Sequence, residues 1–109
     1  MTDELLKDLS SRIMAAEKTV KILLFGSHAL GTSGSNSDID LLVVLDKNET
    51  PQTFKAQAEN YLKISRAIRS IEKKVPIDLL VYTKPEFERF AKSGSQFSKK
   101  ILSEGIDLQ

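Results

Sequence analysis

The sequence predicts a single domain of the α/β or α+β class, in which a mixed β-sheet is flanked by helices. Three short apolar runs predict buried strands, and segments with helical spacing of apolar residues lie before, between and after them. Alternation of this kind is typical of the α/β and α+β classes. The chain has 109 residues, of which 40% are hydrophobic and 28% charged. This length and composition fit one soluble globular domain over residues 1–109.

The first half of the chain predicts a helix, a strand, a short helix and a second strand. Apolar spacings of three and four over residues 3–18 predict an amphipathic helix. The run 20–25, ended by Gly26, predicts a buried strand, and a short helix is expected near 27–30. The strand predicted at 38–45 is apolar on both faces, so we expect it in the middle of the sheet.

The second half begins with a long helix, expected to start at Thr50-Pro51 and to end at Val75-Pro76, with Pro51 in the first turn. Its expected buried face consists of Phe54, Ala58, Tyr61, Ile64, Ile68 and Ile71. Residues 77–83 predict a third strand, and the helix is long enough for a parallel crossover, although the pattern leaves strand direction open. Pro85 opens another helix. One or two helical turns are expected at 96–104 and a short closing strand at 105–108.

Charge and composition exclude several classes of protein. The net charge is +1 and there is no cysteine, so a disulfide framework, a thiolate metal site and a thiol nucleophile are excluded. No apolar run approaches the ~18 residues that a membrane span needs. Charged residues interrupt the N-terminal segment where a signal peptide would be apolar. No basic pattern frames the aromatic residues as a nucleic-acid platform. We therefore expect a cytoplasmic protein that binds neither membranes nor, directly, nucleic acid.

Two aspartates stand at the head of the second predicted strand. Side chains alternate along a strand, so Asp38 and Asp40 point to the same face, with Cα atoms roughly 7 Å apart. Carboxylates at this separation can converge on one ion or bridge two, and Mg²⁺ prefers such oxygen ligands. For an Asp-x-Asp pair alone, a turn or cap residue followed by a solvated strand end is the alternative interpretation.

A Gly-Ser pair at the end of the first strand supplies the complementary half of a candidate site. Without a Cβ, Gly26 lets backbone N–H groups approach a phosphate, and Ser27 adds a hydroxyl donor at the start of a helix. Ser37 could donate to phosphate or ribose. An ordinary strand-to-helix turn and a solvated loop are the alternatives. Taken together, the strand, the Gly-Ser pair, the small polar loop and the Asp-x-Asp strand predict a site for a nucleoside triphosphate and its metal ions.

The spacing of these motifs resembles a known family. Gly26-Ser27, ten intervening residues and Asp38-Ile39-Asp40 match the signature of the DNA polymerase beta-like nucleotidyltransferase superfamily. The short chain resembles the minimal nucleotidyltransferases of this superfamily, the MntA-like antitoxin group. The resemblance covers nearly the whole chain and implies the nucleotidyltransferase fold. One departure is Leu30, because many relatives carry a basic residue at its position.

The resemblance also implies the roles of three aspartates. Asp38 and Asp40 are expected to bind Mg²⁺, as two ions, and a third carboxylate on a neighbouring strand completes such sites. Asp78 stands where this third residue is expected, as the general base, as a metal ligand, or as both. Taken alone, Asp78 would be a charge at the start of a strand.

The implied reaction is attack of a hydroxyl on the α-phosphate of a nucleoside triphosphate, expected to be ATP, with release of pyrophosphate. The resemblance implies that the acceptor is a HEPN-domain toxin. Transfer of AMP to a tyrosine of this toxin is expected to neutralise it. Two alternatives are a non-catalytic antitoxin that acts by contact and an enzyme that modifies a small molecule such as an aminoglycoside. Because the chain is short, we expect a partner chain or a homo-oligomer to complete the pocket.

Overall fold

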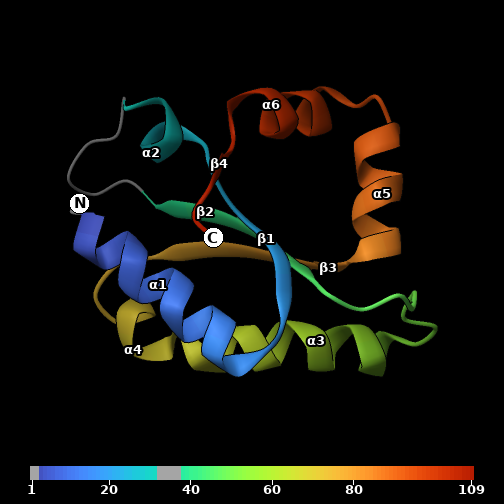
Figure 1. Ribbon diagram of the computed structural model, residues 1–109, viewed down its shortest axis with the longest axis horizontal. Helices are drawn as coiled ribbons and strands as arrows, with labels where there is room; N and C mark the ends of the chain where they lie inside the picture. Colours follow the sequence, from blue (N-terminus) through green and yellow to red (C-terminus); the bar gives the residue numbers. More distant parts are fainter. Residues whose placement is uncertain (1–2, 32–37) are drawn as a thin grey trace.

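The computed structural model describes residues 3–31 and 38–109, and a mixed four-stranded sheet lies at their centre (Figure 1). The strand order is β3-β2-β1-β4. Strand β2 pairs parallel with β3 and antiparallel with β1, and β4 pairs antiparallel with β1. The strand bounds are Thr19–Phe25 for β1, Ile39–Leu45 for β2, Ile77–Thr83 for β3 and Ile106–Asp107 for β4. The predicted mixed sheet is confirmed, and the direction of β3, which the sequence pattern left open, is parallel to β2.

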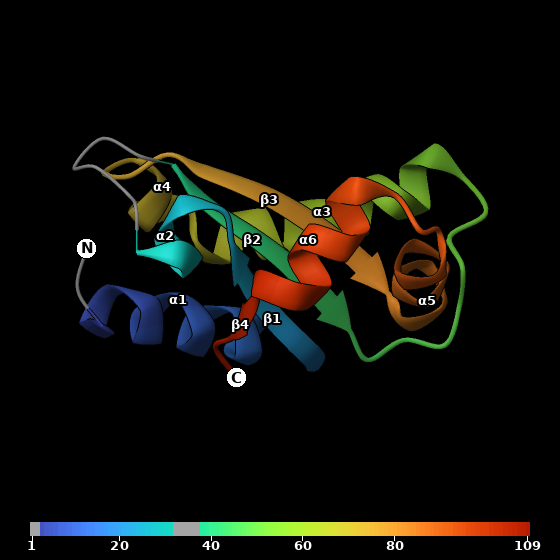
Figure 2. The same ribbon diagram turned by 90° about the horizontal axis from the view of Figure 1, so that it is seen from above.

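Helices cover both faces of this sheet. Helices α1, α3 and α4 lie against one face, and α5 and α6 lie against the other, as Figures 1 and 2 show from two directions. The short helix α2 follows β1 directly. No described helix is both long and apolar enough to cross a membrane. The helix bounds are Asp3–Ala16 for α1, Ser27–Leu30 for α2, Phe54–Ala67 for α3, Arg69–Glu72 for α4, Lys84–Lys92 for α5 and Gln96–Glu104 for α6.

Strand β2 is central and buried on both faces, as its apolar sequence predicts. Leu41 and Val43 pack into the core on the side of α1 and α3, and each is 0% exposed. Leu42 and Val44 face the opposite side and pack with Ile101 of α6. The alternation of strand side chains thus places every even-numbered residue of β2, Asp40 among them, on the face covered by α5 and α6.

The prediction of one long helix from Thr50 to Val75 is wrong in two respects: the helix starts later, and it is divided into α3 and α4. It begins only at Phe54, because the Thr53 side chain accepts a hydrogen bond from the Ala56 N–H at 3.0 Å and caps the helix there. Pro51 therefore lies before the helix, and Phe54 is 85% exposed instead of buried.

The same segment is broken at Ile68, which has φ −110° and ψ 11° and separates α3 from α4. No glycine or proline marks this break in the sequence. Ile64, Ile68 and Ile71 nevertheless all reach the core, as predicted. The apolar spacing thus identified the buried residues from Ile64 onward correctly, but Phe54 and Tyr61 are exposed, and the break between the two helices carries no local signal.

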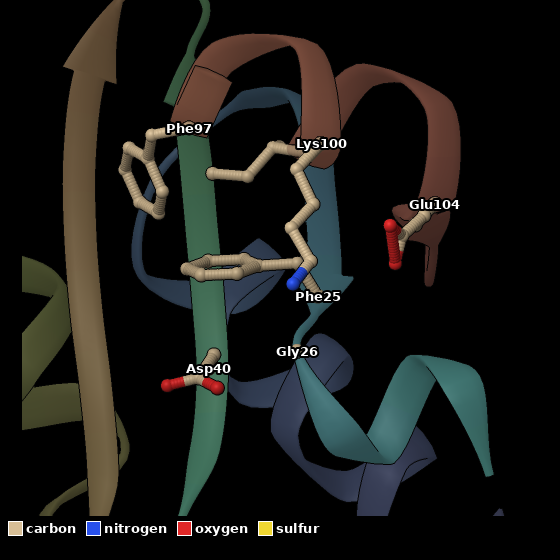
Figure 3. Close-up of a pocket in the computed structure, with 7 residues that line it drawn as sticks. Phe25, Gly26, Asp40, Phe97, Lys100 and Glu104 are labelled. Atoms are coloured by element: carbon tan, nitrogen blue, oxygen red, sulfur yellow. The ribbon is translucent and has the colours of Figure 1, made fainter. Parts of the chain in front are cut away.

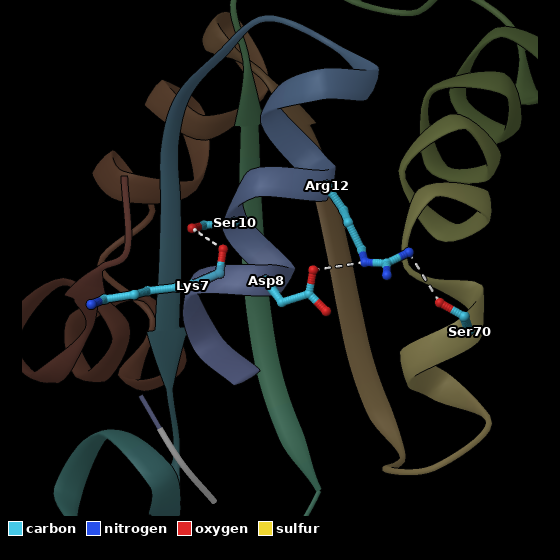
Figure 4. A network of polar contacts seen from close by, with 5 residues as sticks. All are labelled: Lys7, Asp8, Ser10, Arg12 and Ser70. Atoms are coloured by element: carbon cyan, nitrogen blue, oxygen red, sulfur yellow. Dashed lines mark hydrogen bonds and ion pairs between the residues drawn. The ribbon is translucent and has the colours of Figure 1, made fainter. Parts of the chain in front are cut away.

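Polar side chains link α1 to α4 across the outer surface of this layer (Figure 4). Arg12 donates from Nε to Asp8 Oδ1 at 2.9 Å and from Nη1 to Ser70 Oγ at 3.1 Å. Asp8 and Arg12 are each nearly half exposed, so this ion pair contributes at most about 1 kcal/mol. Apolar burial, rather than surface charge, therefore stabilises the contact between these helices and the sheet.

The burial of both faces of β2 can be tested with two adjacent leucines. We expect Leu41→Ala and Leu42→Ala each to lower the free energy of unfolding by about 2–5 kcal/mol, because each leaves a cavity in a different core. Leu102→Ala, on the exposed side of α6, is the matched control and should cost about 0.5 kcal/mol or less. Urea denaturation measures all three values. A large loss in only one of the two core variants would contradict the two-sided burial of β2.

Candidate active site

Two of the predicted aspartates lie side by side on the sheet. The parallel register of β2 and β3 pairs Asp40 directly with Asp78, so both side chains project from the face that α5 and α6 cover. Asp38 immediately precedes β2 and is exposed, so the strand starts one residue later than predicted. Within residues 3–31 and 38–109, no three acidic, histidine or cysteine side chains converge as a metal group. The structure therefore brings Asp40 and Asp78 together, with Asp38 beside them.

The electrostatics of Asp40 reflect this crowding. Burial raises the pKa of the Asp40 carboxyl above its ordinary value, and the charge and hydrogen bonding of Asp78 raise it further. The charge of Asp38 adds to this effect, whereas His28 lowers the pKa. Adjacent carboxylates in a partly buried position favour either a shared proton or a bound cation. Since their oxygen atoms are the ligands that Mg²⁺ prefers, the donor set fits a divalent cation.

Gly26 is required by the close approach of Asp40. Its φ of 76° and ψ of −156° lie in a region that is essentially restricted to glycine. A Cβ at this position would lie 2.2 Å from Asp40 Oδ2. The register pairs Phe25 with Asp40, so the chain turns out of β1 directly beside this carboxylate. The Gly-Ser motif and the Asp-x-Asp motif are therefore in steric contact, and a side chain at residue 26 would displace the Asp40 carboxylate.

The other residues that the sequence analysis singled out in this region are Ser27, Leu30 and Ser37. Ser27 begins α2, as expected, so the predicted short helix after the first strand is confirmed. Leu30 ends that helix and is 50% exposed, without a charge to offer a phosphate. Ser37 lies outside the described residues, so its suggested contact with phosphate or ribose stays a prediction.

Two adjoining pockets open at this end of the sheet, and Asp40 lines both. The first, which we call the α6 pocket, has a volume of about 310 Å³ (Figure 3). The second, which we call the β3 pocket, has a volume of about 410 Å³. The α6 pocket is lined by Phe25, Gly26, Asp40, Phe97, Lys100, Ile101 and Glu104. The β3 pocket is lined by Phe25, Asp40, Tyr61, Ile77, Asp78, Leu79, Leu80 and Phe97.

Sequence reasoning missed the contribution of α6 to these pockets. Phe97 is 49% exposed and lines both pockets. Lys100 and Glu104 line the α6 pocket from the same helix face. Their spacing of four residues is a helical signal that could have grouped them. The sequence gives no indication, however, that this face of the helix meets the Gly26 turn.

Comparison with known proteins supports this description of the fold. A sequence model of the nucleotidyltransferase domain matches residues 3–108. The chain is similar to a toxin–antitoxin structure solved with AMP-PNP, with 21% identity and a TM-score of 0.59 over 94% of this chain and 72% of that chain. It is also similar to a Sulfolobus solfataricus protein assigned to the nucleotidyltransferases, with 19% identity and a TM-score of 0.61 over 95% of this chain and 76% of that chain. No curated protein matches significantly.

The contact between Gly26 and Asp40 predicts a coupling between two substitutions. We expect Gly26→Ala to lower the free energy of unfolding by about 1–3 kcal/mol, since alanine is strained at this backbone conformation and overlaps Asp40 Oδ2. Part of this cost should vanish in an Asp40→Ala background, because the overlapping atom is gone. Gly31 also has a positive φ but open space around it, so Gly31→Ala should add independently to Asp40→Ala. Additive costs for Gly26→Ala and Asp40→Ala would contradict the contact.

The raised pKa of Asp40 predicts a gain in stability when its charge is removed. In metal-free buffer near pH 7 we expect Asp40→Asn to raise the free energy of unfolding by about 1 kcal/mol, because the wild type keeps two repelling carboxylates. The gain should shrink as pH falls through the raised pKa, where Asp40 of the wild type becomes protonated. Added Mg²⁺ should also shrink it, by stabilising the wild type. A variant less stable than the wild type in EDTA at pH 7 would refute the repulsion.

Proposed function

The chain belongs to the nucleotidyltransferase domain family, and we propose that it transfers AMP from ATP to a hydroxyl group on a partner protein. The observation that carries this proposal is the pairing of Asp40 with Asp78 beside the Gly26 turn, at the mouth of two pockets. A hydroxyl acceptor and a triphosphate both need access to such a carboxylate pair. The α6 and β3 pockets offer two approaches to it.

In this proposal the three aspartates bind the metal ions, and one of them accepts the proton of the attacking hydroxyl. Asp38, Asp40 and Asp78 would hold two Mg²⁺ ions, whose chemistry is to neutralise charge on the triphosphate during in-line displacement. Asp78 is more exposed than Asp40, so it is the better placed of the two to accept the proton of an incoming hydroxyl. Gly26 and Ser27 would approach the phosphates through backbone N–H groups and a hydroxyl.

The proposed reaction balances without a further reactant. The acceptor oxygen forms a bond to the α-phosphorus, and its proton passes to Asp78. The bond between the α-phosphorus and the oxygen that bridges to the β-phosphorus breaks, and pyrophosphate leaves with that electron pair. The protein contributes mainly by positioning the two reactants and by stabilising charge that develops in the transition state.

We further propose that the acceptor is a HEPN-domain toxin, so that the chain acts as an antitoxin. Two arguments support this: the family resemblance of the motifs, and the fold shared with a toxin–antitoxin structure solved with AMP-PNP. A second candidate is an antitoxin that blocks its partner by contact alone. The aspartate pair argues against this second candidate. Adjacent carboxylates lower the stability of the protein, and metal binding in catalysis would account for their presence. An aminoglycoside acceptor has no specific observation in its favour.

Substitution of the aspartates tests the proposed chemistry. We expect Asp38→Asn and Asp40→Asn each to abolish transfer to the purified protein encoded by the adjacent gene, while the fold is retained. Incubation with ATP and Mg²⁺ followed by intact mass measurement detects the addition of AMP. Asp8→Asn, on the opposite side of the sheet, is the matched control and should retain wild-type transfer. Normal transfer by both site variants would remove Asp38 and Asp40 as metal ligands.

A further inference from the structure

Lys100 is the one basic side chain, among the described residues, that lines either pocket. We propose that Lys100 binds the triphosphate of the nucleotide and supplies from α6 a positive charge that Leu30, at the end of α2, does not. This inference rests on the proposed function, because it takes the α6 pocket to be part of the nucleotide site.

The position of Lys100 is fixed by the packing of its helix. The adjacent Ile101 is 1% exposed and packs with Leu42 and Val44 against the sheet. This contact sets the rotation of α6, so that Lys100 lies above the end of β1. In Figure 3 the Lys100 side chain extends from α6 toward the segment where Phe25 leads into Gly26. The lysine therefore reaches the turn at which the phosphate groups are expected.

The ammonium group of Lys100 is not committed to a structural ion pair. Within residues 3–31 and 38–109, the ion pairs within 4.0 Å involve other basic residues, even though Glu104 stands one helical turn away. The Glu104 Oε2 atom is buried and has no hydrogen-bond partner in the described residues. Lys100 and Glu104 thus share a pocket without being bonded to each other, which leaves the cation available to an anionic ligand.

The charge balance of the pocket explains why a triphosphate needs this lysine. Glu104 lines the α6 pocket and would repel a phosphate chain, whereas the charge of Asp40, which also lines it, would be neutralised by bound Mg²⁺. The turn after β1 offers no compensating side chain at Leu30, which is apolar. A lysine ammonium is a point charge with three donors on a flexible stem, so it can follow a phosphate group. Charge-assisted bonds of this kind are roughly twice as strong as neutral ones.

Direct binding of Mg-AMP-PNP by calorimetry tests the inference. We expect Lys100→Gln to weaken binding by about tenfold or more, which is the usual effect of losing a hydrogen bond to a charged group. Lys100→Arg should retain most of the affinity, because the charge is kept. Lys99→Gln is the matched control, since Lys99 is exposed on the same helix but lines neither pocket; it should change affinity by less than about twofold.

A comparison of ligands separates phosphate binding from a structural role. The loss in Lys100→Gln should be large for AMP-PNP and small for adenosine, because only the former carries phosphates. Equal losses for both ligands, or unchanged AMP-PNP binding, would overturn the role of Lys100.

The experiments distinguish a failure of the proposed transfer reaction from a failure of the inference about Lys100. If the wild type binds AMP-PNP through Lys100 but transfers nothing to its partner, the proposed reaction falls and this inference stands. If the wild type binds no nucleoside triphosphate, both fall.

Discussion

The in-register pairing of β2 with β3 is the interaction on which the candidate site depends. Because the strands are parallel and Asp40 is opposite Asp78, the backbone register fixes two carboxylates as neighbours. This placement costs stability, because burial and the neighbouring Asp78 disfavour the charged form of Asp40 and so raise its pKa. Leu41, Val43 and their even-numbered neighbours bury β2 on both faces, and this apolar burial offsets that cost.

The second constraint is steric and joins the two motifs. Gly26 and Asp40 are fourteen residues apart in the sequence, yet a Cβ on the glycine would touch the carboxylate. The antiparallel pairing of β1 with β2 brings them together, because Phe25 is the partner of Asp40 in the register. The glycine thus has a role that the motif alone does not reveal. It leaves room for the Asp40 carboxylate of the neighbouring strand, and in the proposed function it would also permit backbone approach to a phosphate.

Local patterns predicted the parts of this architecture that depend on one element at a time. The apolar run of β2 and the Gly-Ser turn follow from alternation and motif spacing. The expected place of Asp78 follows from the family resemblance, and membership of the family confirms that resemblance. The predictions that failed have two kinds of cause, local hydrogen bonding at helix ends and contacts between elements. The Thr53 cap displaces the start of α3, and the break at Ile68 has no sequence signal. The exposure of Phe97 and the contribution of α6 depend on how that helix packs against the sheet.

The distribution of charge in the site follows from the rigidity of its elements. The three aspartates stand on or beside β2 and β3, whose burial holds the backbone in a fixed position, as ligands for small cations require. The positive group stands on the exposed side of a surface helix, at the end of a flexible side chain. A triphosphate changes shape and charge during transfer, so a mobile cation can follow it while the carboxylates stay in place. In the proposed site, this division would let the aspartates keep the fixed geometry of a metal site while Lys100 adjusts from α6 to the phosphate groups.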